Sequence, residues 1–369
     1  MKPFWTLLAA LALGLATAQS VTATLPEAKV EALTTLIETT LTENNLPGAV
    51  VGVWIRGEGE YVAAFGEANL ATGRARDVDD PFRIASITKT FTATAILQLV
   101  DEGKLSTSDT LDNWYPDFPN AAEITVKDLL MMRSGIPDFA EGSVMTSYYD
   151  APLESFSADD AIALSAAKVG DFSPPGEKTV YINTNFVLLE QIVEKVSGQD
   201  MDTFLAEHVF IPLGMTETFY ATEPSLPSLL HGYSWEANTE TFRDMTELNP
   251  DLPGGAGAIV STLGDLRTYV RALCTGALLE PETQRERMRG ATIGGDPSFV
   301  EYGEGVLLLG QFCGHNGTIF GFSSEAFYLP AKDAVIVINV NRLDLDDQSQ
   351  SSNLFFLLTQ TLFPDEVNW

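Results

Sequence analysis

Apolar runs of the length of β-strands lie near both ends of the chain and are rare between them. Such runs cover residues 49–55 and 61–65 early in the chain, and residues 305–309, 318–320, 324–329 and 334–340 late in it. The last run is apolar almost throughout, which indicates a strand covered on both faces. The first two runs flank a Gly-Glu-Gly segment that is typical of a hairpin turn. We therefore expect both ends of the chain to contribute to one antiparallel sheet.

Helical periodicity marks most of the remaining segments. Val30, Leu33, Ile37 and Leu41 recur at the spacing of one helix face, and this pattern ends before Pro47. Further helices are predicted over residues 90–103, 124–132, 158–168, 185–196, 201–210 and 353–362. We expect an α/β fold in which an antiparallel sheet flanked by helices, from residues 26–103 and 254–364, carries an inserted all-helical lobe of residues 104–253.

The first 18 residues have the pattern of a secretory signal peptide. Lys2 is followed by an apolar run from Phe4 to Leu15 and then by Ala16-Thr17-Ala18. This run is shorter than the ~20 residues that a membrane-spanning helix needs. We therefore expect cleavage after Ala18, an exported protein that is periplasmic or secreted, and no stable membrane span after cleavage.

Acidic residues outnumber basic ones, 51 against 21, and the formal net charge is -30. Such a charge repels phosphate backbones and anionic lipid surfaces, so nucleic acid is not an expected partner. A well-solvated surface explains most of these carboxylates, and adaptation to a saline habitat is the alternative. The hydrophobic content of 45% in 369 residues is sufficient for a substantial core.

Cys274 and Cys313 are the two cysteines of the chain. In an oxidising compartment they can form one bridge, which would join a predicted helix around residues 266–273 to the strand that leads into His315. Two buried thiols are the alternative. In neither case do they form a disulfide framework.

Ser86 and Lys89 lie three residues apart at the first turn of the helix predicted up to Gly103. Residues at this spacing share one helix face, so the hydroxyl and the amine can meet. A serine hydroxyl needs a base to take its proton, and the pKa of a desolvated lysine falls far enough for this. The free amides of a helix N-terminus also favour developing negative charge. The pair predicts Ser86 as a nucleophile and Lys89 as its base.

A second pair, Ser165 and Lys168, has the same spacing, so the spacing alone is weak support. This pair comes at the end of its predicted helix, just before Gly170. An exposed amphipathic surface is the simpler interpretation of it. We therefore expect Ser86, and not Ser165, to be the nucleophile.

Tyr181 and Asn183 follow a Pro-Pro-Gly turn and precede the helix predicted from Asn185. Both side chains can project from this connection into a cleft. Tyr181 can relay a proton to a leaving group, and Asn183 can hydrogen-bond a substrate amide. A core tyrosine beside a helix cap is the structural alternative.

The segment His315-Asn316-Gly317-Thr318 is predicted to open a late strand and to bind substrate. Gly317 allows the backbone to approach a ligand closely. The next amide, of Thr318, can donate to an oxyanion together with the amide of Ser86. A plain loop histidine is the alternative for His315.

Together these motifs resemble those of the penicillin-recognising serine hydrolases. The similar branch contains class C β-lactamases, Streptomyces-type D-alanyl-D-alanine carboxypeptidases and related esterases and D-aminopeptidases. The likeness covers nearly all of the chain after the signal peptide, at residues 82–89, 124–130, 134–135, 175–177, 181–185, 254–257, 261–262 and 314–317. It implies the β-lactamase/transpeptidase-like fold, with the active site between the two lobes.

By this resemblance Ser86 is acylated, Lys89 and Tyr181 share the proton transfers, and water hydrolyses the acyl-enzyme. No cofactor and no metal are implied. His315 stands where lactamases of this branch usually carry lysine, and Asn316 replaces a common threonine. A histidine there resembles the carboxypeptidase and esterase members, and both departures weaken the assignment as a β-lactamase. They leave open how a substrate carboxylate is held, because neutral histidine binds anions poorly.

We therefore expect an exported serine hydrolase that resembles a D-alanyl-D-alanine carboxypeptidase or a related amide or ester hydrolase. Its expected substrate is a small peptide, amide or ester, with a peptidoglycan stem peptide as one candidate. A β-lactamase, or a non-hydrolytic penicillin-binding or sensor protein on the same fold, is the alternative. The chain has no Gly-x-Ser-x-Gly elbow and no His-Glu-x-x-His zinc motif. His208 and His231 are expected to be structural, and Tyr148, Tyr149 and Trp235 are candidate pocket walls.

Overall fold

The computed structural model describes residues 18–226, 230–294, 299–344 and 350–367. The predicted signal peptide lies outside the described residues except for Ala18, which begins the first strand. Within the described residues, no helix is long and apolar enough to cross a membrane.

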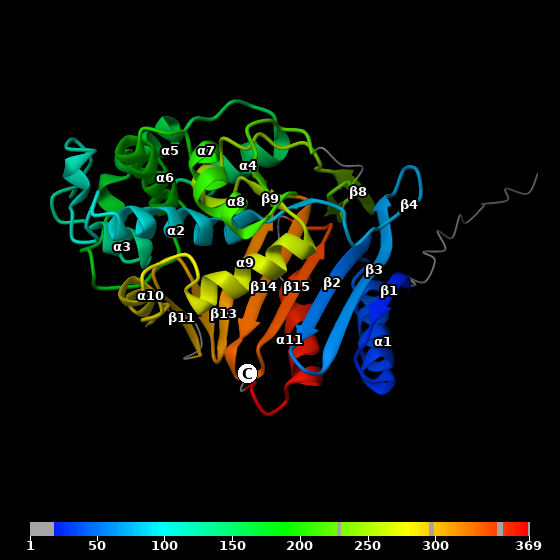
Figure 1. Cartoon of the computed structure of the whole chain (residues 1–369). Helices are drawn as coiled ribbons and strands as arrows, with labels where there is room; N and C mark the ends of the chain where they lie inside the picture. The colour runs from blue at the N-terminus through cyan, green and yellow to red at the C-terminus, as the bar shows by residue number, and fades with distance from the viewer. Residues whose placement is uncertain (1–17, 227–229, 295–298, 345–349, 368–369) are drawn as a thin grey trace, which may run out of the picture.

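A ten-stranded antiparallel sheet, counted over the described residues, forms the base of the structure (Figure 1). Its order is β1-β3-β2-β15-β14-β13-β12-β11-β10, with β4 paired to β3. The strands are β1 (Ala18–Ala23), β2 (Gly48–Ile55), β3 (Gly59–Asn69), β4 (Arg74–Ala75), β10 (Ala291–Thr292), β11 (Val300–Tyr302), β12 (Leu307–Leu309), β13 (Phe312–Ile319), β14 (Phe322–Leu329) and β15 (Ala334–Val340). Because β2 pairs with β15, the two ends of the chain meet in the middle of the sheet, as expected.

Helices cover both faces of this sheet. The helix α9 (Leu263–Thr275) crosses one face over β14 and β15, and α1 (Glu27–Glu43) and α11 (Gln350–Leu362) pack together on the other (Figure 1). The predicted stripe of α1 is confirmed, because Leu33, Ile37 and Leu41 are buried. All seven residues of β15 are buried, which agrees with its unbroken apolar sequence.

Most of the remaining helices gather above the sheet, and α10 (Pro281–Arg287) lies beside its β11 edge (Figure 1). The others are α2 (Thr88–Asp101), α3 (Val126–Leu130), α4 (Ser143–Asp150), α5 (Ala158–Ala167), α6 (Thr184–Ser197), α7 (Met201–Leu205) and α8 (Ile211–Leu213). The inserted segment is mainly helical but also contains three short strands. These are β6 (Phe219–Tyr220), which joins β5 (Phe82–Arg83) and β9 (Ile259–Ser261) in a small sheet, and the hairpin of β7 (Tyr233–Glu236) and β8 (Thr241–Asp244).

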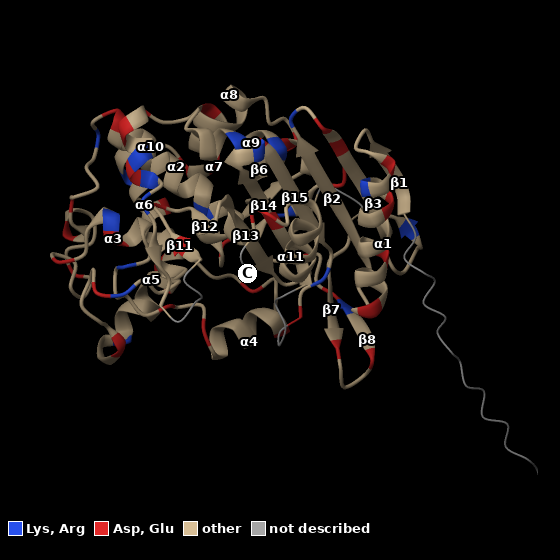
Figure 2. Ribbon diagram, turned by 90° about the horizontal axis from the view of Figure 1, so that it is seen from below, with Lys and Arg blue, Asp and Glu red and all other residues tan. Residues whose placement is uncertain are grey.

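Asp and Glu residues are spread along the ribbon of both lobes, whereas Lys and Arg residues gather visibly on α9 and α10 (Figure 2). The -30 charge is therefore a property of the surface as a whole. Molecules that carry such a charge repel one another, which keeps their surfaces solvated.

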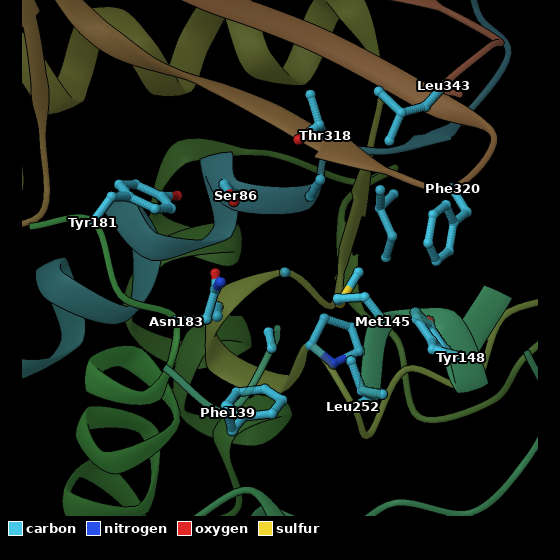
Figure 3. A pocket seen from close by; sticks show the side chains of 16 residues that line it. Ser86, Phe139, Met145, Tyr148, Tyr181, Asn183, Leu252, Thr318, Phe320 and Leu343 are labelled. Carbon is cyan, nitrogen blue, oxygen red and sulfur yellow. The ribbon is translucent and has the colours of Figure 1, made fainter. Parts of the chain in front are cut away.

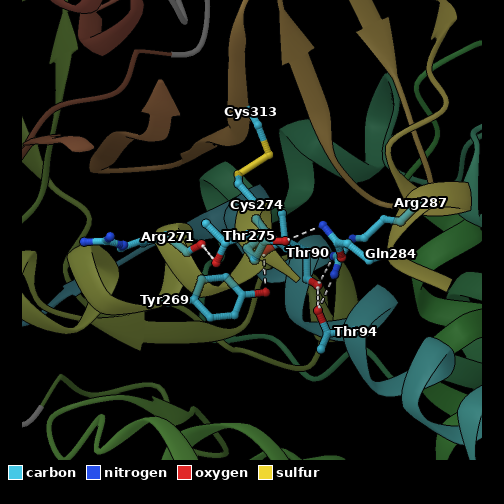
Figure 4. The surroundings of a disulfide bond; sticks show 10 residues. Thr90, Thr94, Tyr269, Arg271, Cys274, Thr275, Gln284, Arg287 and Cys313 are labelled. Carbon is cyan, nitrogen blue, oxygen red and sulfur yellow. Dashed lines mark hydrogen bonds between the residues drawn. A yellow bond between two sulfur atoms is a disulfide. The ribbon is translucent and has the colours of Figure 1, made fainter. Parts of the chain in front are cut away.

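A disulfide joins Cys274, near the end of α9, to Cys313 in β13, with a Cα–Cα distance of 6.0 Å (Figure 4). Beneath it, the buried guanidinium of Arg287 donates to Thr94 Oγ1 and to the carbonyl of Thr90, both at 2.9 Å. These bonds connect α10 to α2, and the disulfide connects α9 to β13. The strand β13, which carries His315-Asn316-Gly317-Thr318, is thus held from the helix side.

The strand β13 begins at Phe312, earlier than the sequence predicts. His315 lies within this strand and does not open it, so that detail of the prediction is wrong. Cys313 and Gly314 are paired with β12 on one edge and with β14 on the other. Glycine has a low strand propensity, so Gly314 suggests a strand end in the sequence. The pairing with β12 and β14 includes Gly314, so the strand does not end there.

Candidate active site

Ser86 lies in a turn of 3-10 helix, Ala85–Ile87, immediately before α2. The preceding residue, Ala85, has a φ of +49°, in the left-handed region that residues with a Cβ rarely adopt. Such a conformation costs on the order of 1–3 kcal/mol and persists only where the surroundings enforce it. The sharp turn presents Ser86 at the end of α2, facing the sheet.

The amine of Lys89 lies in the first turn of α2 and is fully buried. It donates to Ser86 Oγ at 2.8 Å and to the carbonyl of Ala256 at 2.9 Å. Burial lowers the pKa of Lys89 to about 7, and the carboxylate of Asp138 partly opposes this effect. An appreciable fraction of the amine is therefore neutral near pH 7 and able to accept the serine proton.

Tyr181 faces the same pair from the connection before α6, and its hydroxyl points toward Ser86 (Figure 3). Lys89 Nζ lies 4.9 Å from the centroid of its ring. Burial raises the pKa of Tyr181, and hydrogen bonding with Ser86 acts in the opposite direction. The group thus remains a phenol at neutral pH, which suits a proton relay and not a resting general base.

Asn183 is oriented by the buried carboxylate of Asp138. Its backbone amide and its side-chain Nδ2 both donate to Asp138 Oδ2, at 3.1 and 2.8 Å. Asp138 Oδ1 accepts from the amide and the hydroxyl of Thr184, both at 3.3 Å. Asn183 lines the cavity beside Ser86, and with its nitrogen engaged its side-chain carbonyl is the group that can accept a further hydrogen bond.

Gly317 brings β13 into direct contact with the Ser86 turn. A Cβ at Gly317 would lie 2.1 Å from the carbonyl oxygen of Ile84 and 3.0 Å from the amide nitrogen of Ser86. Glycine is therefore required here by close approach of two backbones. The next residue, Thr318, lines the space around Ser86.

His315 is buried and turned away from solvent. Its Nε2 lies 3.2 Å from the hydroxyl of Tyr302, and its Nδ1 pairs with the carbonyl of Asn316. Burial lowers the pKa of His315 to about 3. The ring is neutral at physiological pH, so His315 supplies no positive charge for a substrate carboxylate.

Two cavities meet at Ser86, and Tyr181 and Thr318 line both. The first, about 270 Å³, we name the aromatic cavity; its walls include Phe139, Met145, Tyr148, Leu252 and Phe320 (Figure 3). The second, about 360 Å³, we name the glutamate cavity; it extends along β13 past His315 to Glu325 and Phe355. No described lysine or arginine lines either cavity.

The structure brings together Ser86, Lys89, Tyr181, Asn183 and the motif in β13. Among the three aromatic residues proposed as walls, Tyr148 lines the aromatic cavity, whereas Tyr149 bonds Glu236 and Trp235 packs against Phe242.

The other two histidines lie away from this site. His231 pairs with Asp244 on the surface, and His208 stacks on Phe204. Within the described residues, no group of three or more His, Cys, Asp or Glu side chains is arranged to hold a metal ion.

The rival pair does not form a catalytic contact. Ser165 is fully buried, so its assignment to an exposed surface is wrong. Its hydroxyl donates to the carbonyl of Pro137 at 2.6 Å, and Lys168 donates to the carbonyl of Asp138. Both side chains thus support the loop that carries Asp138; Ser165 does so from the interior, and Lys168 does so from a partly exposed position where it also pairs with Glu141.

Sequence reasoning missed the residues that hold this site from behind. Asp138, Tyr302 and the carbonyl of Ala256 each contact a residue of the three motifs, as described above. The sequence carries no signal for Asp138, because a buried carboxylate is recognised only from the donors that surround it in the folded structure.

A protein-family model described as Beta-lactamase matches residues 33–357. The chain belongs to the β-lactamase family. It is similar to penicillin-binding protein 4* of Bacillus subtilis strain 168, with 27% identity over 331 residues, 85% of this chain and 72% of that protein. The chain spans about two thirds of the length of the curated relatives that it matches.

Solved structures in the family include amide hydrolases. A D-stereospecific amidohydrolase from Streptomyces sp. has a TM-score of 0.78 and 28% identity, over 91% of this chain and 98% of that chain. The D-amino acid amidase from Ochrobactrum anthropi SV3, solved with L-phenylalanine amide, has a TM-score of 0.81 and 26% identity over the same shares. The predicted resemblance and fold are confirmed, and the chain is a serine hydrolase of the penicillin-recognising superfamily.

Proposed function

We propose that the protein hydrolyses small amides and esters through an acyl-enzyme on Ser86. The observation that carries this proposal is the buried, 2.8 Å contact between Lys89 Nζ and Ser86 Oγ at the junction of two cavities. Neutral Lys89 accepts the serine proton as Oγ attacks the carbonyl carbon. The amides of Ser86 and Thr318 are the proposed donors to the oxyanion.

Breakdown of the tetrahedral intermediate requires a proton on the leaving group. Lys89 and Tyr181 both contact the Ser86 hydroxyl, and the amine lies 4.9 Å from the centroid of the tyrosine ring, so we expect a proton to pass from the protonated amine through the phenol to the departing nitrogen or oxygen. Water then attacks the ester on Ser86, and the same groups act in reverse. The neutral oxygen of Asn183 holds the N–H of an amide substrate.

Among amide hydrolases, two narrower activities remain. A D-alanyl-D-alanine carboxypeptidase must hold a substrate carboxylate, and no described cationic side chain other than Lys89 lies beside Ser86. An amidase for D-amino acid amides needs no such group, and two structural relatives bear that kind of name. The cavities therefore favour the amidase over the carboxypeptidase.

A kinetic panel on the purified protein tests the proposal. It comprises a D-amino acid amide and its L-form, a D-Ala-D-Ala peptide, a p-nitrophenyl ester and nitrocefin. Turnover of amide or ester should fall by about a thousandfold or more in Ser86→Ala. An unchanged thermal melt would show that this variant is folded, and equal activity of the two proteins would refute the role of Ser86.

The same panel separates the alternatives. Efficient nitrocefin turnover would identify a β-lactamase. Stoichiometric labelling by a fluorescent penicillin, without steady-state turnover of any substrate, would identify a penicillin-binding or sensor protein. Peptide turnover that exceeds amide turnover would identify a carboxypeptidase and a stem peptide as its substrate class.

We also propose that the protein is exported and processed after Ala18. The support is the pattern of the first 18 residues, together with the disulfide between Cys274 and Cys313, which forms in oxidising compartments. Mass spectrometry of the protein recovered from cell fractions tests this, and a full-length chain confined to the cytoplasm would contradict it.

A further inference from the structure

The glutamate cavity contains a buried carboxyl group that the proposed acyl transfer does not use. Glu325 lies in β14 with 1% of its surface exposed, and it lines the cavity that begins at Ser86. Its Cα is directly opposite that of Asn316 across the β13–β14 ladder, so the two side chains share one face of the sheet. This is the face that α11 covers, through Ser351 and Ser352.

The hydrogen bonds of Glu325 leave one oxygen free. Ser351 and Ser352 donate to the same oxygen, Oε1, at 3.0 and 2.6 Å. Among the described residues, Oε2 accepts no hydrogen bond and no cationic side chain pairs with the carboxyl group. Burial raises the pKa of Glu325 to about 7. A carboxylate at such a position is stabilised strongly by an incoming positive charge.

Resting on the proposed function, we propose that the glutamate cavity is a subsite for a primary ammonium group of the substrate, which Glu325 binds through its free oxygen. An ammonium has three donors and suits a site that offers Oε2 and the uncharged amide of Asn316. The walls of Leu307, Leu309 and Phe355 surround the alkyl part that carries the charge. The substrate class is thus an amide or ester that bears an amine near the scissile bond.

The spacing along β13 sets the reach of this amine. Asn316, opposite Glu325, precedes Thr318 by two residues, which corresponds to about 7 Å along a strand. Thr318 lies beside Ser86, so an ammonium about 4 Å from the reacting carbonyl, with a hydrogen bond of about 3 Å to the carboxyl group, spans this distance. The same carboxyl group disfavours a substrate carboxylate there, because like charges repel at short range in a buried site.

Binding of n-pentylammonium, compared with 1-pentanol, tests the subsite without turnover. Calorimetric titration uses Ser86→Ala, so the result does not depend on hydrolysis. We expect the ammonium to bind at least about tenfold more tightly, since hydrogen bonds to charged groups contribute 1.5–3 kcal/mol. Glu325→Gln in the same background should remove this preference, and Glu325→Asp, which keeps the charge, should keep part of it.

A matched control is Glu304→Gln, which alters another almost fully buried glutamate that lines neither cavity. This variant should retain the preference. Equal binding of the ammonium and the alcohol by the parent protein, or a preference that survives Glu325→Gln, would overturn the proposal. The first comparison needs no change at Glu325, so poor folding of a variant cannot hide the answer.

Paired substrates show whether the subsite acts in catalysis. Each pair compares an amine with an uncharged analogue of the same length. The first pair is the p-nitrophenyl esters of 3-aminopropanoate and of butanoate, and the second pair is the acetate esters of 2-aminoethanol and of propanol. We expect about tenfold higher kcat/KM for the amine in one pair, and no difference in Glu325→Gln. If the protein binds the ammonium but hydrolyses both members of each pair equally well, the cavity is not a substrate subsite. If the parent protein shows no Ser86-dependent turnover of any substrate, the proposed function is refuted and the binding result still stands.

Discussion

The amine of Lys89 lies 2.8 Å from Ser86 Oγ in a position where the lysine has no access to water. Burial lowers the pKa of Lys89 to about 7, far below that of a solvated lysine. Only the neutral form of the amine can act as the proposed base, and its fraction falls about tenfold for each pH unit below this pKa. The proposed mechanism thus ties acylation to pH through Lys89.

We expect kcat/KM for ester hydrolysis to rise with pH and to level off above about 7. His315 cannot produce this rise, because its pKa is lowered to about 3. A pH profile with a p-nitrophenyl ester measures the effect. Lys89→Ala should lose most of the activity together with the rise, and a flat profile between about pH 5 and 8 would contradict Lys89 as the base.

Asp138→Asn should move this profile to lower pH. The carboxylate of Asp138 raises the pKa of Lys89, so removing its charge lets that pKa fall further. The same change disturbs Asn183, whose side chain and amide both bond Asp138 Oδ2, and KM for amides should increase. Asp159→Asn, at an exposed position of α5, is the control and should change neither quantity.

Gly317→Ala should impair catalysis and folding together. The added Cβ would lie 2.1 Å from the carbonyl oxygen of Ile84, so β13 must move away from the Ser86 turn. We expect a loss of kcat/KM of about a hundredfold or more and a loss of stability of about 1–3 kcal/mol.

Gly264→Ala is the control for Gly317→Ala, because no atom lies within 4 Å of a Cβ placed at this position of α9. It should stabilise the helix by up to about 1 kcal/mol. Steady-state kinetics and urea unfolding of the two variants measure these effects. Full activity of Gly317→Ala would show that the close backbone contact is dispensable.

Replacing both cysteines by serine should destabilise the protein by about 4 kcal/mol, the entropy estimate for a loop of this size. The bridge closes a segment with a sequence separation of 39 residues. Urea unfolding of the double variant, and of the parent with and without reductant, tests this. At low temperature the variant should still acylate Ser86, since the disulfide lies behind β13 and not in a cavity; equal stabilities would show that the bridge contributes nothing.

Glu325→Gln should stabilise the free protein at alkaline pH. The pKa of Glu325 is about 7 when folded, against an unfolded value near 4.5. The folded state therefore holds the extra proton between these values, and stability contributed by this group falls as pH rises through them. We expect the variant to gain up to about 3 kcal/mol relative to the parent at pH 8 and little at pH 4. A gain independent of pH would contradict this account.

Much of the architecture follows from patterns that repeat. The stripe of α1, the hairpin of β2 and β3 and the unbroken apolar run of β15 are periodic features, and each is found where the sequence predicts it. Ser86, Lys89 and Tyr181 are recognisable because a nucleophile needs specific partners at specific spacing.

The supporting residues are not predictable in this way. Glu325 becomes important only because the register of β13 and β14 sets it opposite Asn316 and because α11 covers it. Ser165 was assigned to the surface because its helix ends nearby, yet the loop of Pro137 folds over it. Isolated polar residues have no period, and their burial depends on contacts between distant segments.

The pairing of β2 with β15 has a consequence for the order in which the protein becomes active. Ser86 and Lys89 are synthesised early, whereas Gly317 and β15 are among the last parts of the chain to be made. Until these arrive, the sheet lacks its central β2–β15 pair and the Ser86 turn lacks the backbone of β13 against which it packs. A nascent chain therefore holds the proposed nucleophile and base without the strand that carries Thr318, the proposed oxyanion donor, and the site becomes complete only when the last strands are made.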